Sequence, residues 1–81
     1  MKLPRDISGE YLAAALCKQW NYRRVHQVGS HIILETDQPM HQRIAIPAHK
    51  ELRIGTLNSI LRAVADTKQT TRQAVLKSLI G

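Results

Sequence analysis

The sequence is poor in cysteine and in aromatic residues: its 81 positions include one cysteine, one tryptophan, two tyrosines and no phenylalanine. A lone cysteine excludes an internal disulfide. Cys17 falls on the apolar side of an expected helix, and this position favours a core residue over a nucleophile. No cysteine–histidine spacing indicates a zinc site, so we expect no metal and no cofactor. So few aromatic side chains also argue against a β-sheet surface on which the bases of single-stranded nucleic acid stack.

Long apolar runs are missing as well. No stretch approaches the roughly 20 apolar residues that a membrane-spanning helix needs, and residues 1–5 contain no apolar segment of the kind found in signal peptides. We therefore expect no membrane association and a cytoplasmic location. The short length and the apolar content of 43% predict a single folded domain over residues 1–81.

Among the charged residues, positive charge dominates. Twelve lysines and arginines stand against six acidic residues, which gives a formal net charge of +6. A small domain with this excess attracts polyanions, because each phosphate that it neutralises releases condensed counterions. Acidic protein surfaces are attracted too. Charge alone thus leaves nucleic-acid binding and a merely soluble basic surface equally open.

The spacing of apolar residues predicts three helices. Ser8 is the expected cap of the first, with Ile7 packed on Leu12 as a hydrophobic staple. Thr56 is the expected cap of the second, and the polar residues 66–69 interrupt its pattern. Thr70 and Gln73 resemble a capping box that begins the last helix.

Three strands are expected between the first two helices, at residues 22–27, 31–36 and 42–47. The element order is therefore αβββα with a terminal helix, an α+β fold with a three-stranded antiparallel sheet. A two-residue turn at Val28-Gly29 would place His26 opposite His31 and Arg24 opposite Ile33.

One face of this sheet is expected to pack on the helices and the other to stay open. Ile32, Leu34, Ile44 and Ile46 would point to the core. The open face would carry Arg24, His26, His31, Glu35 and Arg43. Such a face can bind and cleave a phosphodiester, but it is also what the solvated side of an ordinary antiparallel sheet looks like.

Several short motifs occur in an order that is typical of a known family. They are Leu-Pro-Arg-Asp-Ile-Ser-Gly at 3–9, Gly-Ser-His at 29–31, Pro-Ala-His at 47–49, Gly-Thr-Leu at 55–57 and Ser-Ile-Leu-Arg at 59–62. From about residue 3 to residue 65 the sequence resembles HicA (YcfA-like) toxins. It departs from them at His26, where arginine is common, at the turn 37–41, and at residues 65–69, which lead into a longer last helix.

The resemblance implies a fold like that of double-stranded-RNA-binding domains, with helices on one side of the sheet. It also implies an mRNA interferase of a type II toxin–antitoxin pair, with mRNA as substrate and a HicB-type antitoxin as partner. In this family the histidine of the Gly-Ser-His motif is catalytic, which here is His31.

RNA carries its own nucleophile, the 2′-hydroxyl, so its cleavage requires proton transfer and cations but no metal. Histidine suits both proton roles, and we expect His31 to be the general acid or base, presented by Gly29 and Ser30. His26 is either a second proton carrier or a solvent-facing strand residue, and His49 either contacts RNA or caps loop carbonyls. The expected phosphate contacts are Arg24, Arg43, His49, Lys50, Arg53 and Arg62. The alternative function is an RNA-binding module that does not cut.

Overall fold

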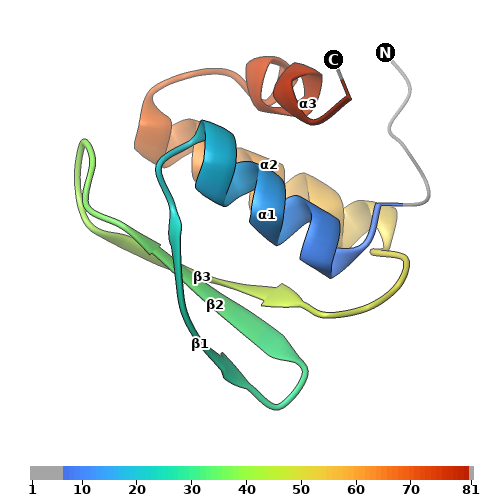
Figure 1. Ribbon diagram of the computed structural model, residues 1–81. Helices are drawn as coiled ribbons and strands as arrows, with labels where there is room; N and C mark the ends of the chain where they lie inside the picture. Colours follow the sequence, from blue (N-terminus) through green and yellow to red (C-terminus); the bar gives the residue numbers. More distant parts are fainter. Residues whose placement is uncertain (1–6, 81) are drawn as a thin grey trace.

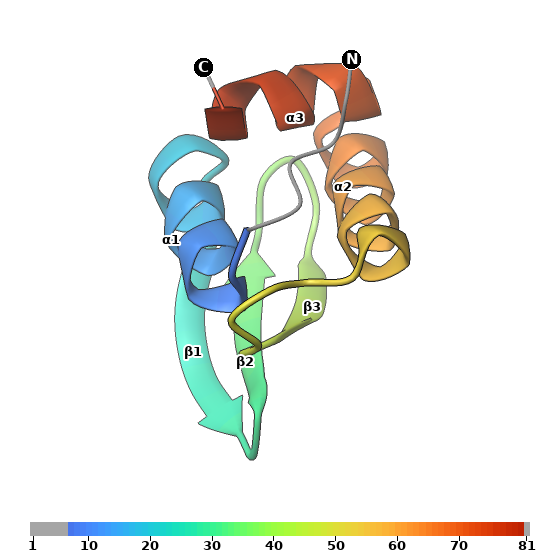
Figure 2. The same cartoon turned by 90° about the vertical axis from the view of Figure 1, so that its right-hand side faces the viewer.

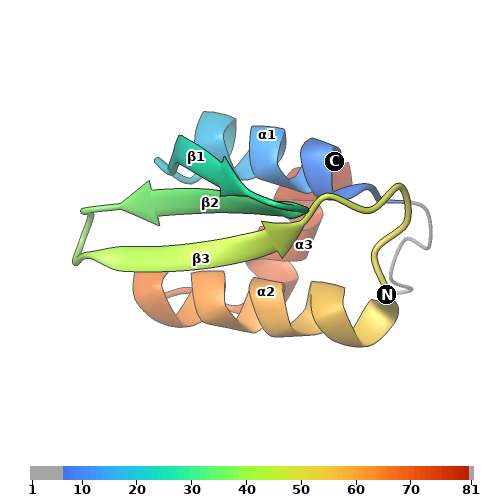
Figure 3. The ribbon, with the colours of Figure 1, turned by 90° about the horizontal axis from the view of Figure 1, so that it is seen from below.

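The computed structural model describes residues 7–80, so the first four residues of the 3–9 motif lie outside it. The elements follow the order α1 (Gly9–Gln19), β1 (Arg23–Val28), β2 (His31–Thr36), β3 (Gln42–Pro47), α2 (Ile54–Lys68) and α3 (Arg72–Ile80). The three strands form one antiparallel sheet in the order β1-β2-β3. The predicted α+β fold is confirmed, and the helices gather on one side of the sheet (Figures 1 and 3).

The core lies between the sheet and the helix layer. Ile32 and Leu34 of β2 and Ile46 of β3 are completely buried, as their alternation along the strands predicts. From the helices the fully buried side chains are Leu12, Leu16, Leu57, Leu61, Val64, Val75 and Leu76. Burial of this one face leaves the opposite face of the sheet without a covering element in the described part of the chain.

The start of α1 agrees with the prediction, but the ends of the other helices do not. Ser8 Oγ accepts a hydrogen bond from the Tyr11 amide at 3.0 Å, so Ser8 is the cap of α1. The predicted cap of α2 at Thr56 is wrong, because the helix begins at Ile54 after an extended Arg53. Thr71 rather than Thr70 caps α3, since its hydroxyl accepts from the Ala74 amide at 3.1 Å.

The break predicted at residues 66–69 is also wrong, because α2 continues through Lys68. It ends at Gln69, whose φ of 57° is left-handed and lets its amide bind the carbonyls of Ala65 and Asp66. Tertiary packing overrides the polar composition here, since Thr67 is buried within the helix layer. None of the helices in residues 7–80 has the length and apolar character needed to cross a membrane.

Helix α3 lies across one end of α1 and α2 (Figure 2). Its carbonyl end is held by α1, because Tyr11 donates its hydroxyl proton to the Leu79 carbonyl at 2.6 Å and Gln19 donates to that of Ser78 at 2.9 Å. Trp20 donates its indole N–H to Ser78 Oγ at 2.7 Å. The contacts from Tyr11 and Gln19 satisfy carbonyls that the end of a helix leaves free, so α3 closes the helix layer.

The start of α1 packs closely against the chain that follows β3. The Gly9 amide donates to the His49 carbonyl, and the Leu52 amide donates to the Ile7 carbonyl, each at 2.9 Å. A Cβ atom on Gly9 would lie 1.9 Å from the Pro47 carbonyl oxygen. The segment 48–53 is therefore fixed to α1 at its backbone, although much of its surface is exposed.

Candidate active site

A tight hairpin presents His31 at the first position of β2. Gly29 and Ser30 form the two-residue turn, and Gly29 has a φ of 58°, which glycine adopts without strain. The turn lies one residue later than predicted, so His26 faces Ile33 and not His31. The two histidines nevertheless share a face as diagonal neighbours, with Cα atoms roughly 7–8 Å apart in such a geometry.

A β-bulge in β1 changes which arginine lies on the open face. The register shifts between Arg24 and His26, so beyond Val25 the partners become Arg24↔Leu34 and Arg23↔Glu35. The predicted place of Arg24 on the open face is wrong: it lies on the helix side, where it pairs with Glu10 at 2.9 Å. The extra residue of a bulge moves the following side chains to the other face, and Arg23 takes the open position.

The segment 48–53, which begins beside the turn before His31, carries cations that have no ion-pair partner among the described residues. His31 is exposed and pairs through its backbone with Val28 and Pro47. The Ala48 amide donates to the Ser30 carbonyl at 2.7 Å, so the segment 48–53 begins beside the turn. Its exposed side chains include those of His49, Lys50 and Arg53. Within the described residues none of these three makes an ion pair, and the His49 ring caps no loop carbonyl.

The middle of the open face is crossed by Arg43. This arginine lies on β3, and its guanidinium donates to His26 Nε2 on β1 at 3.0 Å. Beneath this contact Ile33 is only 8% exposed, although it is on the face away from the helices. Because a guanidinium can only donate hydrogen bonds, the Nε2 lone pair of His26 is occupied while the contact lasts.

Ion pairs continue from Arg43 toward the opposite end of the sheet. Glu35 Oε2 lies 3.7 Å from Arg43 Nε, and Glu35 Oε1 lies 3.3 Å from Arg23. Arg23 also binds Asp37 at 2.8 Å, and Asp37 lies 3.0 Å from His41 Nδ1. Hydrogen bonds from His41 and Arg23 hold the pKa of the Asp37 carboxyl below its usual value. The far end of the face is thus electrically compensated, in contrast to the His31 end.

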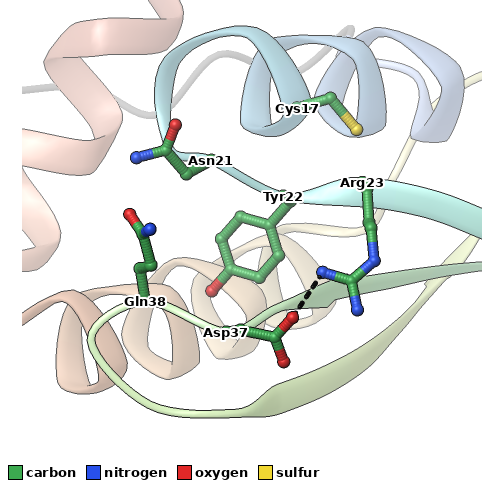
Figure 4. Close-up of a pocket in the computed structure, with 6 residues that line it drawn as sticks. All are labelled: Cys17, Asn21, Tyr22, Arg23, Asp37 and Gln38. Atoms are coloured by element: carbon green, nitrogen blue, oxygen red, sulfur yellow. Dashed lines mark hydrogen bonds and ion pairs between the residues drawn. The ribbon is translucent and has the colours of Figure 1, made fainter.

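A shallow pocket of about 320 Å³ lies at this compensated end, lined by Cys17, Asn21, Tyr22, Arg23, Asp37 and Gln38 (Figure 4). Its polar walls are already engaged: Arg23 binds Asp37, and the Tyr22 hydroxyl donates to Gln42. Lys68 lies 4.8 Å from the centre of the Tyr22 ring and donates to Thr36 Oγ1 at 2.8 Å. We interpret the pocket as the edge of the core, remote from His31.

Burial of Tyr22 predicts an alkaline limit to stability. It raises the pKa of the Tyr22 phenol from its ordinary value of 10.0 to about 12, so folding favours the neutral phenol. This contribution is complete below pH 10, where the unfolded phenol is also neutral, and is lost as the pH rises toward 12. Urea titrations between pH 9 and 12 should show the loss in the wild type and in Tyr11→Phe, and a smaller one in Tyr22→Phe.

Among the described residues no group of three or more histidine, cysteine, aspartate and glutamate side chains could hold a metal ion.

A comparison with protein families matches residues 10–65 to the family described as the HicA toxin of bacterial toxin–antitoxin systems. The match spans the whole sheet, most of α1 and most of α2, and it includes His31, while α3 lies outside it. Comparisons with curated proteins and with solved structures find no match.

Proposed function

The chain belongs to the HicA toxin family of bacterial toxin–antitoxin systems, and on that basis we propose that it is an endoribonuclease that cleaves mRNA with His31 as general acid or base. The observation that supports this proposal is the position of His31. It stands exposed at the turn end of a sheet face that no described residue covers, and segment 48–53, with cations unpaired among the described residues, begins beside that turn. An RNA strand can reach this imidazole without any rearrangement of the core.

The proposed reaction is an in-line attack of the ribose 2′-hydroxyl on the adjacent phosphorus. A base takes the hydroxyl proton, the P–O5′ bond breaks, and an acid protonates the leaving 5′-oxygen, which leaves a 2′,3′-cyclic phosphate. His31 suits one of these proton transfers, because both of its ring nitrogens are free of hydrogen bonds within residues 7–80. In the same arrangement His26 is a poorer proton acceptor, since Arg43 occupies its Nε2 atom.

Purified protein incubated with RNA and a chelator tests the proposal directly. Cleavage that persists in the chelator, with 2′,3′-cyclic phosphate ends identified by mass analysis, supports it. Products with 5′-phosphate ends would contradict the role given to the 2′-hydroxyl. RNA binding without any cleavage would favour the alternative, a non-catalytic RNA-binding module with the same fold.

The unpaired cations of segment 48–53 predict a strong dependence of RNA binding on salt. Each phosphate contact contributes about 0.7 to 0.9 to the slope of log K against log salt concentration. We expect the double variant Lys50→Gln/Arg53→Gln to bind RNA more weakly and to lower the slope by roughly 1.4 to 1.8. The matched control removes two exposed lysines of the helix layer, Lys18→Gln/Lys77→Gln, and should leave the slope nearly unchanged.

Membership of the family implies an antitoxin as partner. We propose a HicB-type protein with an acidic surface, which would complement the net charge of +6. Coverage of the open sheet face by this partner would keep RNA away from His31. A neighbouring reading frame for a small acidic protein, and loss of RNA cleavage when that protein is added, would support the assignment.

A further inference from the structure

We propose that Glu35 is a positioning residue, which holds the Arg43 guanidinium across the sheet against His26 and does not itself bind RNA. The consequence for catalysis rests on the proposed function, whereas the structural role of Glu35 does not. Among the residues that could act on RNA, sequence patterns singled out cations and histidines. A carboxylate in the middle of an RNA-binding face has no obvious purpose there, because it repels phosphate.

The place of Glu35 in the sheet supports this role. It lies on the central strand, and its two direct cross-strand partners on the open face are Arg23 of β1 and Arg43 of β3. It forms ion pairs with both arginines. Its side chain is 18% exposed, against 60% for Glu10 and Asp37, the other carboxylates that pair with arginine in the described chain. Glu35 is therefore the carboxylate most enclosed by its partners.

Arg43 is held at two separate points of its guanidinium. Its Nε lies 3.7 Å from Glu35, and one terminal nitrogen donates to His26 at 3.0 Å, over the buried Ile33. The other terminal nitrogen makes no hydrogen bond to any described residue, so both of its hydrogens are free for an oxygen of a phosphate. A guanidinium that is already oriented loses less side-chain freedom when a phosphate binds, and it meets the reacting group in a defined geometry.

Two explanations of Glu35, a general effect of its charge and the positioning of Arg43, predict different effects on RNA cleavage when its negative charge is removed. Without that charge the face becomes more positive, so simple attraction predicts tighter RNA binding and no loss of turnover. If Glu35 orients Arg43, its loss frees the guanidinium and lowers the rate at which bound RNA is cleaved. The split between kcat and KM separates these two outcomes.

The experiment compares Glu35→Gln with Asp66→Asn, which removes the same charge from an exposed position on α2, in the helix layer. We expect kcat on an RNA oligonucleotide to fall on the order of tenfold in Glu35→Gln, with KM unchanged or lower. Asp66→Asn should keep the wild-type kcat, and Glu35→Asp should recover part of the loss. An unchanged kcat in Glu35→Gln would overturn the positioning role in catalysis.

A second measurement judges Glu35 without relying on cleavage. The ¹⁵N chemical shifts of the His26 ring report whether Nε2 accepts a hydrogen bond. In the wild type we expect one dominant tautomer, with the proton on Nδ1, and in Glu35→Gln a shift toward the mixture of an unrestrained histidine, with His31 unchanged. Identical His26 spectra in both proteins would contradict the proposal. If the wild type does not cleave RNA, the proposed function fails, while the spectra still decide the role of Glu35.

Discussion

Replacement of His31 by alanine is expected to abolish RNA cleavage while the fold and RNA binding persist. The rate should fall by roughly 10²–10⁴-fold, the usual contribution of a general acid or base. The side chain is exposed and makes no hydrogen bond in the described part of the chain, so its removal opens no cavity. Single-turnover cleavage assays and filter binding on the same RNA, with circular dichroism to compare the folds, measure the three properties separately.

The matched control is His41→Ala. His41 is another exposed histidine, but it lies in the turn between β2 and β3 and contacts Asp37 at the compensated end of the sheet. Its loss should change cleavage little. Equal losses in the two variants would point to a general effect of imidazole charge on RNA attraction. Full activity in His31→Ala would remove the proposed chemistry altogether.

Substitution of Gly9 by alanine is expected to destabilise the protein by about 3 kcal/mol, the upper end of the range for overpacking. The added Cβ would meet the Pro47 carbonyl oxygen at 1.9 Å. That oxygen belongs to the backbone at the end of β3, and the same region is tied to α1 by the hydrogen bond from the Gly9 amide to His49. Neither partner can move without breaking these contacts. Chemical denaturation of the purified variant measures the loss.

Gly55→Ala is the control for this prediction. Gly55 lies in the first turn of α2, and a Cβ there meets nothing within 4 Å. Because alanine has the higher helix propensity, this change should be neutral or stabilise the protein by up to about 1 kcal/mol. Two glycine-to-alanine changes at helix starts are thus expected to have opposite signs. A neutral Gly9→Ala would show that α1 does not pack on β3 as closely as the structure has it.

Much of the fold could be predicted because local patterns and tertiary packing agree. The strands His31–Thr36 and Gln42–Pro47 lie at the predicted positions, since their alternating apolar residues fit one buried face. The predicted last helix is also present, and it buries Val75, Leu76 and Leu79. The exposure of His31 followed from its place next to a glycine turn, but its catalytic role was taken from the family resemblance and stays a prediction.

The prediction failed where a single residue changes the geometry of everything beyond it. The bulge at Val25 carries no clear signal in the sequence, yet it exchanges the faces of Arg23 and Arg24. The predicted cap of α3 is misplaced by one residue, because two neighbouring threonines compete for the same role. The predicted cap of α2 is misplaced by three residues, because Arg53 makes no side-chain cap hydrogen bond and leaves no capping signal in the sequence. Thr71 was as good a candidate for the cap of α3 as Thr70, because either hydroxyl can accept from the amide three residues later, and in the structure Thr71 does so.

The sequence by itself determined the order of elements, the core face of the sheet and an exposed histidine at a hairpin. These follow from periodicity and turn chemistry, which act between residues close together in the chain. Only the tertiary structure decided that Arg23 replaces Arg24 on the open face, that Gly9 touches the end of β3, and that Glu35 and His26 share Arg43. Such contacts depend on strand register, and one bulge shifts a register without changing the hydrophobic pattern that a sequence displays.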